Sequence, residues 1–145
     1  MLKYEEEKLP EVEEEILNLL AKAGEDAISN LMLDILRILS VFHGVLWKTE
    51  ISQDLIKFYR TLGEPEIINP KMIDAAIKNL ENIGLIRTEK RVRGMPFSIQ
   101  TYQDLLVRLT DKFATREILQ KDEKYRRYIL ERDKAIREAL NEHEY

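Results

Sequence analysis

The sequence contains no cysteine and only two histidines, His43 and His143. The lack of cysteine excludes disulfide bonds, thiolate metal sites and cysteine nucleophiles. Two histidines are too few for a zinc site built from imidazole ligands, so we expect no bound metal and no cofactor. The sequence also lacks a Gly-rich phosphate loop, a nucleophile-elbow serine and a His-Glu metal motif. We therefore expect no catalytic residues and no enzymatic activity.

Long apolar runs are also missing, since none reaches the roughly eighteen residues that a membrane span requires. The first ten residues, MLKYEEEKLP, are acidic where a signal peptide would be basic and then apolar. We therefore expect a cytoplasmic protein that does not contact a membrane. Of the 145 residues, 44% are hydrophobic, which suffices for a single domain over residues 1–145. Abundant charged residues and the absence of cysteine favour a thermophilic source.

Charge is distributed unevenly along the chain. Acidic residues outnumber basic ones by 27 to 23, which gives a formal net charge of −4. Residues 1–84 hold nine Lys and Arg against sixteen Asp and Glu, whereas residues 85–145 hold fourteen against eleven. The basic residues are densest in RTEKRVR, residues 87–93, where four of seven positions are basic. Such a local basic surface, more than the net charge, decides whether a protein binds a polyanion.

In the first half of the chain, apolar residues recur every three or four positions, which predicts helices. The first helix lies within residues 1–25, with Pro10 in its first turn and Gly24 at its end. The second helix covers residues 27–42. Its apolar stripe is so broad that we expect this helix to be buried at the centre of the fold.

Two further helices are predicted before residue 84. A short extended piece at 45–47 precedes the third helix, for which Thr49 or Ser52 is the expected N-cap. The Asn-Pro pair at 69–70 is expected to cap and begin the fourth helix. Gly84 ends the fourth helix, because glycine readily adopts the left-handed conformation that often follows a helix.

After residue 84 the apolar period changes to two, which predicts a β-hairpin. In its first strand, Arg87, Arg91 and Arg93 would share one exposed face, because side chains alternate across a strand. The sequence RGMP predicts the turn, and we expect Phe97 and Ile99 in the return strand. A third extended piece is expected at 105–109.

Residues 111–145 contain neither Gly nor Pro, which predicts one long helix. Apolar residues at steps of seven and four form a stripe that one small core cannot cover, so we expect a homodimer. The expected dimerisation stripe consists of Ile118, Tyr125, Ile129, Ile136 and Leu140. Asp122 and Arg132 interrupt a strict heptad, so packing over only a few turns is expected. In the alternative, this helix folds back over its own domain and covers Val12 and Ile16.

The predicted order of elements, together with two sequence segments, resembles the winged helix-turn-helix superfamily. The segment AIKNLENIGLIRTEKR resembles the junction between recognition helix and wing, and LLVRLTDKF resembles the last strand and following helix of MarR-like regulators. The resemblance spans roughly residues 27–120. The expected fold is thus mainly α with a small β-hairpin: a winged-helix core at 27–110, an extra N-terminal helix at 1–25 and a long C-terminal helix at 111–145.

This resemblance implies a DNA-binding protein that works as a dimeric transcription regulator or chromatin-associated factor of a prokaryotic, archaeal cell. In the superfamily, the third core helix enters the major groove of double-stranded DNA while the hairpin reaches phosphates. The residues expected to contact DNA are Lys71, Lys78, Asn79 and Asn82 on the fourth helix and Arg87, Lys90, Arg91 and Arg93 on the hairpin.

Other functions stay open. Asp74 and Ala75 stand where DNA-reading relatives often carry Ser, Thr or Arg, and the turn GEPEIIN brings two more acids to that side. These residues favour a winged helix that binds a protein partner within a replication, transcription or other assembly. A third possibility is an RNA or single-strand binder that stacks bases on Tyr102, Tyr125 or Tyr128. Finally, the arginines could simply protect the hairpin edge from aggregation.

Overall fold

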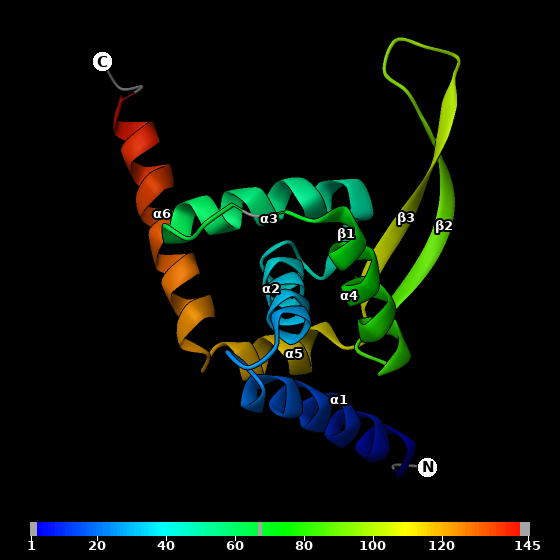
Figure 1. Cartoon of the computed structure of the whole chain (residues 1–145), viewed down its shortest axis with the longest axis vertical. Coiled ribbons are helices and arrows are strands. Elements are labelled where there is room, and N and C mark those ends of the chain that lie inside the picture. The colour runs from blue at the N-terminus through cyan, green and yellow to red at the C-terminus, as the bar shows by residue number, and fades with distance from the viewer. Residues whose placement is uncertain (1–2, 67, 143–145) are drawn as a thin grey trace.

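The computed structural model describes residues 3–66 and 68–142. Within these residues it is mainly helical, with a small three-stranded antiparallel sheet whose two longer strands leave the body as a hairpin (Figure 1). Helix α2, Ala27–Val41, runs through the centre and is almost entirely buried from residue 32 to residue 40. The prediction of a buried central helix is therefore confirmed.

Helices α3 and α4 follow α2 along the chain. Strand β1, Val45–Trp47, leads directly into α3, Lys48–Leu62. Neither Thr49 nor Ser52 caps α3, because Glu50 accepts a hydrogen bond from the backbone N–H of Trp47 at 3.0 Å and thus satisfies the first turn. The predicted caps of α3 were therefore wrong.

Helix α4, Pro70–Asn82, begins and ends as the sequence predicted. The Asn69 side chain accepts hydrogen bonds from the backbone N–H groups of Lys71 and Met72. After the helix, Gly84 adopts φ +82°, a left-handed conformation that glycine enters without steric cost.

The sheet has the strand order β1-β3-β2, with β2 at Ile86–Gly94 and β3 at Thr101–Leu109. The predicted return strand and third extended piece are thus one strand. Phe97 and Ile99 lie outside it, in the turn, because the backbone N–H of Met95 bonds to the carbonyl of Gln100 and closes a longer loop. Their expected place in a strand was wrong, and both side chains are fully exposed.

The C-terminal segment is two helices, α5 at Lys112–Leu119 and α6 at Glu123–Glu142, in place of the single predicted helix. Asp122 explains the break. Its carboxylate accepts hydrogen bonds from the buried Arg37 guanidinium at 2.7 and 3.2 Å and from the backbone N–H of Tyr125 at 3.0 Å. The same side chain therefore caps α6 and ties the start of α6 to α2.

Helix α6 packs against α3, where Tyr125 and Tyr128 are buried and the rings of Tyr128 and Phe58 lie 4.6 Å apart. Asp34 of α2 completes a buried polar cluster, since it accepts hydrogen bonds from Arg37 and from the Tyr59 hydroxyl and pairs with Lys124. Burial, followed by the negative charge of Asp34, raises the pKa of the Tyr59 hydroxyl, which keeps it a hydrogen-bond donor.

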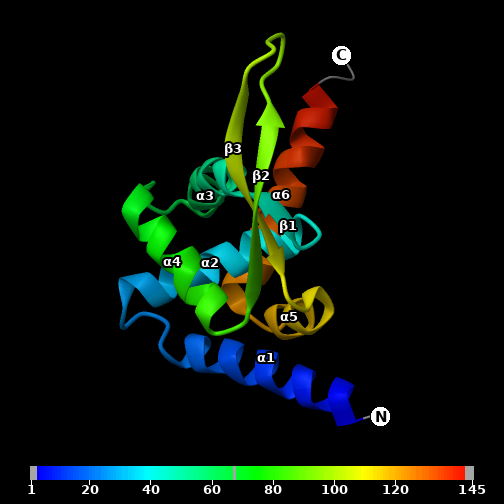
Figure 2. The ribbon, with the colours of Figure 1, turned by 90° about the vertical axis from the view of Figure 1, so that its right-hand side faces the viewer.

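Helix α1, Lys3–Ala21, crosses the body on the side away from the hairpin tip and packs against α5 and α2 (Figure 2). It begins before Pro10, so the predicted start was wrong; the preceding Glu, Lys and Leu residues are good helix formers. Val12, Ile16 and Leu19 are buried in the core. The element that covers α1 is α5, so the C-terminal segment does fold back over its own domain.

None of the described helices combines the length and apolar character that a bilayer span requires.

Candidate functional site

Side chains of the sheet alternate between two faces. The inner face carries Ile86, Val107, Leu109 and Leu46, which belong to the core. We call the opposite side the outer face; its strand residues are Arg87, Glu89, Arg91, Arg93, Tyr102, Asp104, Leu106, Arg108, Val45 and Trp47. The outer face thus gathers four arginines from β2 and β3.

Arg87 and Arg108 stand directly opposite each other on neighbouring strands of the outer face. Both are exposed, and neither has an acidic side chain within ion-pair distance among the described residues. Like charges placed opposite each other destabilise a sheet in the absence of a counter-ion. This arrangement leaves an open cationic site. The sequence did not indicate the pairing, since only the strand register brings Arg108 to Arg87.

Arg93, in contrast, is engaged within the protein. Its guanidinium pairs with Asp104 at 2.8 Å and its central carbon lies 4.3 Å from the centre of the Trp47 ring. The Thr49 hydroxyl also donates to Asp104, at 2.8 Å. Burial alone would raise the pKa of Asp104, but the hydrogen bonds from Thr49 and Arg93 outweigh it and lower this pKa. Arg93 is thus half-buried, which departs from the fully exposed face that the sequence predicted.

The other two basic residues of β2 are exposed but lie on different faces. Arg91 is on the outer face and pairs with Glu89 at 3.0 Å, both side chains being solvent-exposed. Lys90 is on the inner face, opposite Leu105 of β3 and further toward the tip than the strand residues that cover the core. It forms no ion pair among the described residues. The hairpin therefore presents cations on both of its faces.

The lysines predicted on α4, Lys71 and Lys78, are exposed, but acidic residues lie between and beyond them. Asp74 pairs with Lys48 of α3. Glu81 accepts hydrogen bonds from the backbone N–H and the hydroxyl of Thr88 on β2. Since Thr88 is an inner-face residue, α4 lies against the inner face, opposite to Arg87 and Arg108.

The predicted asparagines of α4 point elsewhere. Asn79 and Asn82 line a groove between α4, α1 and α2, together with Glu15 and Lys22. Lys78, one turn before Asn82, lines a different groove with Lys48 and Thr88, so the three predicted residues do not share one groove. Within the described residues, no continuous basic stripe joins α4 to the hairpin, because Asp74 and Glu81 interrupt it and the arginines lie on the other face.

The hairpin tip combines cations with exposed apolar side chains. Phe97 and Ile99 are fully exposed, and Val92 and Met95 are partly so. Figure 2 shows the hairpin extending from the body toward the same end of the molecule as the C-terminal part of α6. The segment from residue 90 to residue 103 contains three basic residues and no acidic residue. The sequence shows these basic and apolar residues side by side. Because Phe97 and Ile99 were predicted to lie in a strand, their exposure at a tip was not predicted.

The predicted dimerisation stripe is divided by the fold. Tyr125 is only 6% exposed, and Ile118 and Ile129 pack against the core of their own chain, so these three are not free to face a partner. Ile136 and Leu140, on the half of α6 that leaves the body, are 43% and 61% exposed. The prediction of one continuous dimerisation stripe was therefore wrong, because the break at Asp122 turns the first half of the stripe toward the core of its own chain.

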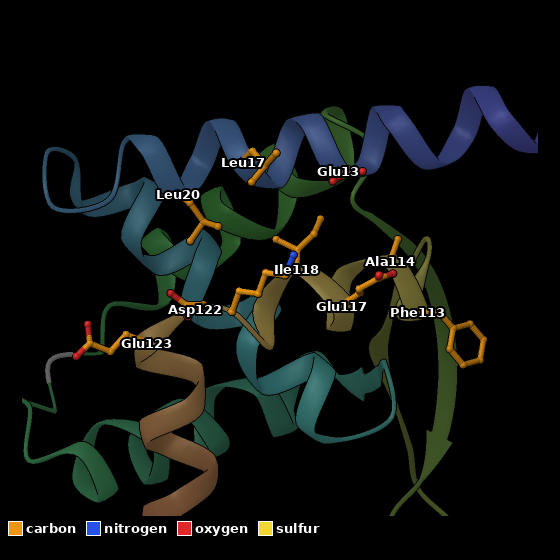
Figure 3. Close-up of a pocket in the computed structure, with 10 residues that line it drawn as sticks. Glu13, Leu17, Leu20, Phe113, Ala114, Glu117, Ile118, Asp122 and Glu123 are labelled. Carbon is orange, nitrogen blue, oxygen red and sulfur yellow. The ribbon is translucent and has the colours of Figure 1, made fainter.

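A groove of about 620 Å³ lies between α1 and α5, on the far side from the hairpin tip (Figure 3). Leu17 and Leu20 of α1 face Ile118 of α5 across it, while Glu13 and Glu117 are among the acidic residues at its edge. Such acidic surroundings disfavour an anionic ligand. Among the described residues, no three His, Asp or Glu side chains come together as a metal site.

Taken together, the outer face and the hairpin tip offer cations, arginine hydrogen-bond donors and apolar side chains on one projecting arm. Arg87 and Arg108 can each donate bidentate hydrogen bonds to an oxyanion such as a phosphate. Compared with models of known protein families and with curated protein sequences, the chain matches none.

Proposed function

We propose that this chain is a DNA-binding protein with a winged helix-turn-helix core, in which the hairpin is the wing. The proposal is supported by the order of elements, in which α2, β1, α3 and α4 precede the β2–β3 hairpin. It is also supported by the concentration of basic residues on that hairpin. The role we propose is that of a transcription regulator or chromatin-associated factor that binds double-stranded DNA with little sequence preference.

The observation that carries the proposal is the pair formed by Arg87 and Arg108. Two exposed guanidinium groups held opposite each other, with Glu89 nearby but no acid within ion-pair distance, cost the fold stability, and an anion between them would offset that cost. Adjacent phosphates of a DNA backbone supply such an anion. Arg91, further along the outer face, would extend the contact along the backbone, whereas Lys90 would reach a phosphate from the inner face of the hairpin.

Helix α4 has a lesser role in this proposal. Lys71 and Lys78 would contact phosphates, whereas Asp74 and Glu81 repel them. Asn79 and Asn82, which line the groove toward α1, are poorly placed to read bases in the same groove of DNA. Phosphate contacts position a protein on DNA but carry no sequence information directly. We therefore propose binding that depends mainly on the hairpin and discriminates weakly between sequences.

The test is a binding titration of the parent protein and of the double variant Arg87→Ala, Arg108→Ala on a random duplex. Each neutralised phosphate contributes about tenfold in affinity at ~50 mM salt through counter-ion release, so the double variant should bind about 100-fold more weakly. Both sites are exposed, so the thermal midpoint should not fall. Fluorescence anisotropy of a labelled duplex gives the affinity, and circular dichroism gives the midpoint.

The matched control is Arg126→Ala, Arg137→Ala, which removes the same charge from two exposed positions of α6. We expect this control to bind within about threefold of the parent, since distant exposed charges are largely screened. Equal losses in both double variants would contradict a specific role for the outer face.

We also propose that DNA is bound by a homodimer. The support is the distal half of α6, where Ile136 and Leu140 are exposed on one side of a helix that leaves the body. Two apolar residues one helical turn apart form the kind of short seam along which two helices pack. Two copies would double the number of phosphate contacts without any change in the site itself.

The second candidate function is that of a winged helix that binds a protein partner. It is favoured by the acidic residues of α4, because Asp74 and Glu81 stand where a DNA-reading helix would meet phosphates. A folded parent protein that does not bind duplex DNA at ~50 mM salt would favour this candidate over the first.

A further inference from the structure

The hairpin tip carries a feature that neither the core nor the phosphate contacts explain. Phe97 and Ile99 are fully exposed at the end of a projecting arm and contact no part of the core. A large apolar side chain that stays in water gains nothing for folding. Soluble proteins that expose such residues together at one site commonly use them for binding.

The tip is held in a defined shape despite its exposure. Phe97 adopts φ +60°, a left-handed conformation that is uncommon for a bulky residue. Three hydrogen bonds hold the turn around it: Met95 N–H to the Gln100 carbonyl, Ser98 N–H to the Met95 carbonyl, and Gln100 N–H to the Ser98 hydroxyl. Backbone strain of this kind persists where surrounding structure fixes it, which is common at binding sites.

The charges around the tip select its partner. From residue 90 to residue 103 the hairpin carries Lys90, Arg91 and Arg93 and no acid. Arg91 and Arg93 pair with Glu89 and Asp104 just outside these bounds, so the unpaired charge below the tip is that of Lys90 and, toward the body, of Arg87 and Arg108. The matching partner presents anions on the outside and apolar surface within. Duplex DNA does so, since phosphates border the grooves and stacked bases lie between them. We propose that Phe97 and Ile99 form a wedge that enters the minor groove, separates a base step and kinks the DNA.

The length of the cationic surface favours DNA over a lipid bilayer. Arg87 and Gly94 are seven strand residues apart, which corresponds to about 23 Å at ~3.3 Å per residue. The polar layer of a bilayer leaflet is only about 5–8 Å thick. A tip buried in acyl chains would therefore leave Arg87 and Arg108 beyond the lipid headgroups. An arm lying along DNA reaches phosphates over its whole length.

This inference rests on the proposed DNA binding, but bending and binding are measured separately. The experiment uses a duplex of about 30 base pairs with a dye at each end, together with a second duplex that carries 2-aminopurine at a TA step, the type that kinks most easily. The parent protein should shorten the end-to-end distance and raise the 2-aminopurine emission.

The variant Phe97→Ser, Ile99→Ser, whose changes lie in water, should keep its fold and the salt dependence of its affinity. It should lose both bending signals, while its affinity for the duplex should fall by less than about tenfold.

The variant Arg87→Ala, Arg108→Ala provides the reverse control: it should weaken binding, while DNA saturated with it stays bent. If the parent binds duplex DNA without bending it, or if the serine variant bends it equally, the wedge is refuted and the proposed function stands. If the parent binds no DNA, both proposals fail. Binding to vesicles of phosphatidylcholine and phosphatidylserine that requires Phe97 and Ile99, without DNA bending, would likewise refute the wedge and identify the tip as a membrane anchor.

Discussion

At the scale of single residues, Asp104 shows how the hairpin is fixed to the body. Its carboxylate is only 2% exposed and binds both Arg93 and Thr49, so it joins the shaft of the hairpin to the first turn of α3. Arg93 also covers the Trp47 ring. One of the four basic residues of β2 therefore anchors the hairpin, which leaves the other three for a partner.

Asp104→Asn should lower the free energy of unfolding by about 1–2 kcal/mol at pH 7, because hydrogen bonds to a charged group are worth more than neutral ones. The folded pKa of Asp104 is lowered, so its contribution is complete above the ordinary carboxyl pKa of about 3.9 and is lost as pH falls through the folded pKa. Urea denaturation should therefore show a constant difference between pH 7 and ~5 and a shrinking one at pH ~3. A difference that is as large at pH ~3 as at pH 7 would contradict this account.

Residue-level signals in the sequence predicted both ends of α4, where the chemistry is local. Asn69 and Gly84 act within one turn of their own backbone, so their roles in bounding α4 could be predicted. The partners of Arg87 and Arg93 could not, since Arg108 and Asp104 reach them through strand register and side-chain packing. Two arginines of the same strand thus have different roles, and the spacing of residues in the sequence does not show which role each one has.

At the scale of elements, the break between α5 and α6 decides how the C-terminal segment is used. A continuous helix would carry one long apolar stripe, as the sequence predicted. Asp122 prevents this because it binds Arg37 of the buried α2 and caps α6. The sequence contained Asp122 as an interruption of the heptad, but its partner lies 85 residues away, beyond the reach of pattern analysis.

Asp122→Ala should destabilise the protein by about 3 kcal/mol, because it leaves the buried Arg37 with a single carboxylate partner and removes the cap of α6. The control is Asp133→Ala, at an exposed position of the same helix, for which we expect a change within about 0.5 kcal/mol. Chemical denaturation monitored by circular dichroism provides both values. Similar losses for the two variants would show that the Arg37–Asp122 pair does not secure α6.

At the scale of the whole molecule, the uneven charge of the sequence becomes a spatial separation. The hairpin bears the exposed Arg87, Arg91 and Arg108 at one end of the body, whereas α1 and α5 border an acidic groove on the far side (Figure 1 and Figure 3). The net charge of −4 hides this separation. A polyanion is therefore attracted to the hairpin and repelled from the opposite end.

The proposed homodimer is tested by light scattering. The parent at micromolar concentration should have a mass near twice 17.2 kDa. Ile136→Glu with Leu140→Glu should give a folded monomer, because the charges prevent an apolar contact between two copies of α6. Lys134→Glu, a charge change on the other side of the helix, should remain dimeric. A parent protein that is monomeric at this concentration would refute the dimer.

The salt dependence of the affinity is the most direct measurement of DNA binding by the outer face, because it counts the phosphates that the protein neutralises. If Arg87, Arg108 and Arg91 each neutralise one phosphate, the outer face contributes about −2.7 per protomer to the slope of the logarithm of the binding constant against the logarithm of salt concentration, and phosphate contacts of Lys71, Lys78 and Lys90 add to this value. The variant Arg87→Ala, Arg108→Ala should reduce this slope by about 1.8. An unchanged slope in that variant, or no binding by the parent at ~50 mM salt, would contradict DNA binding through the outer face of the hairpin.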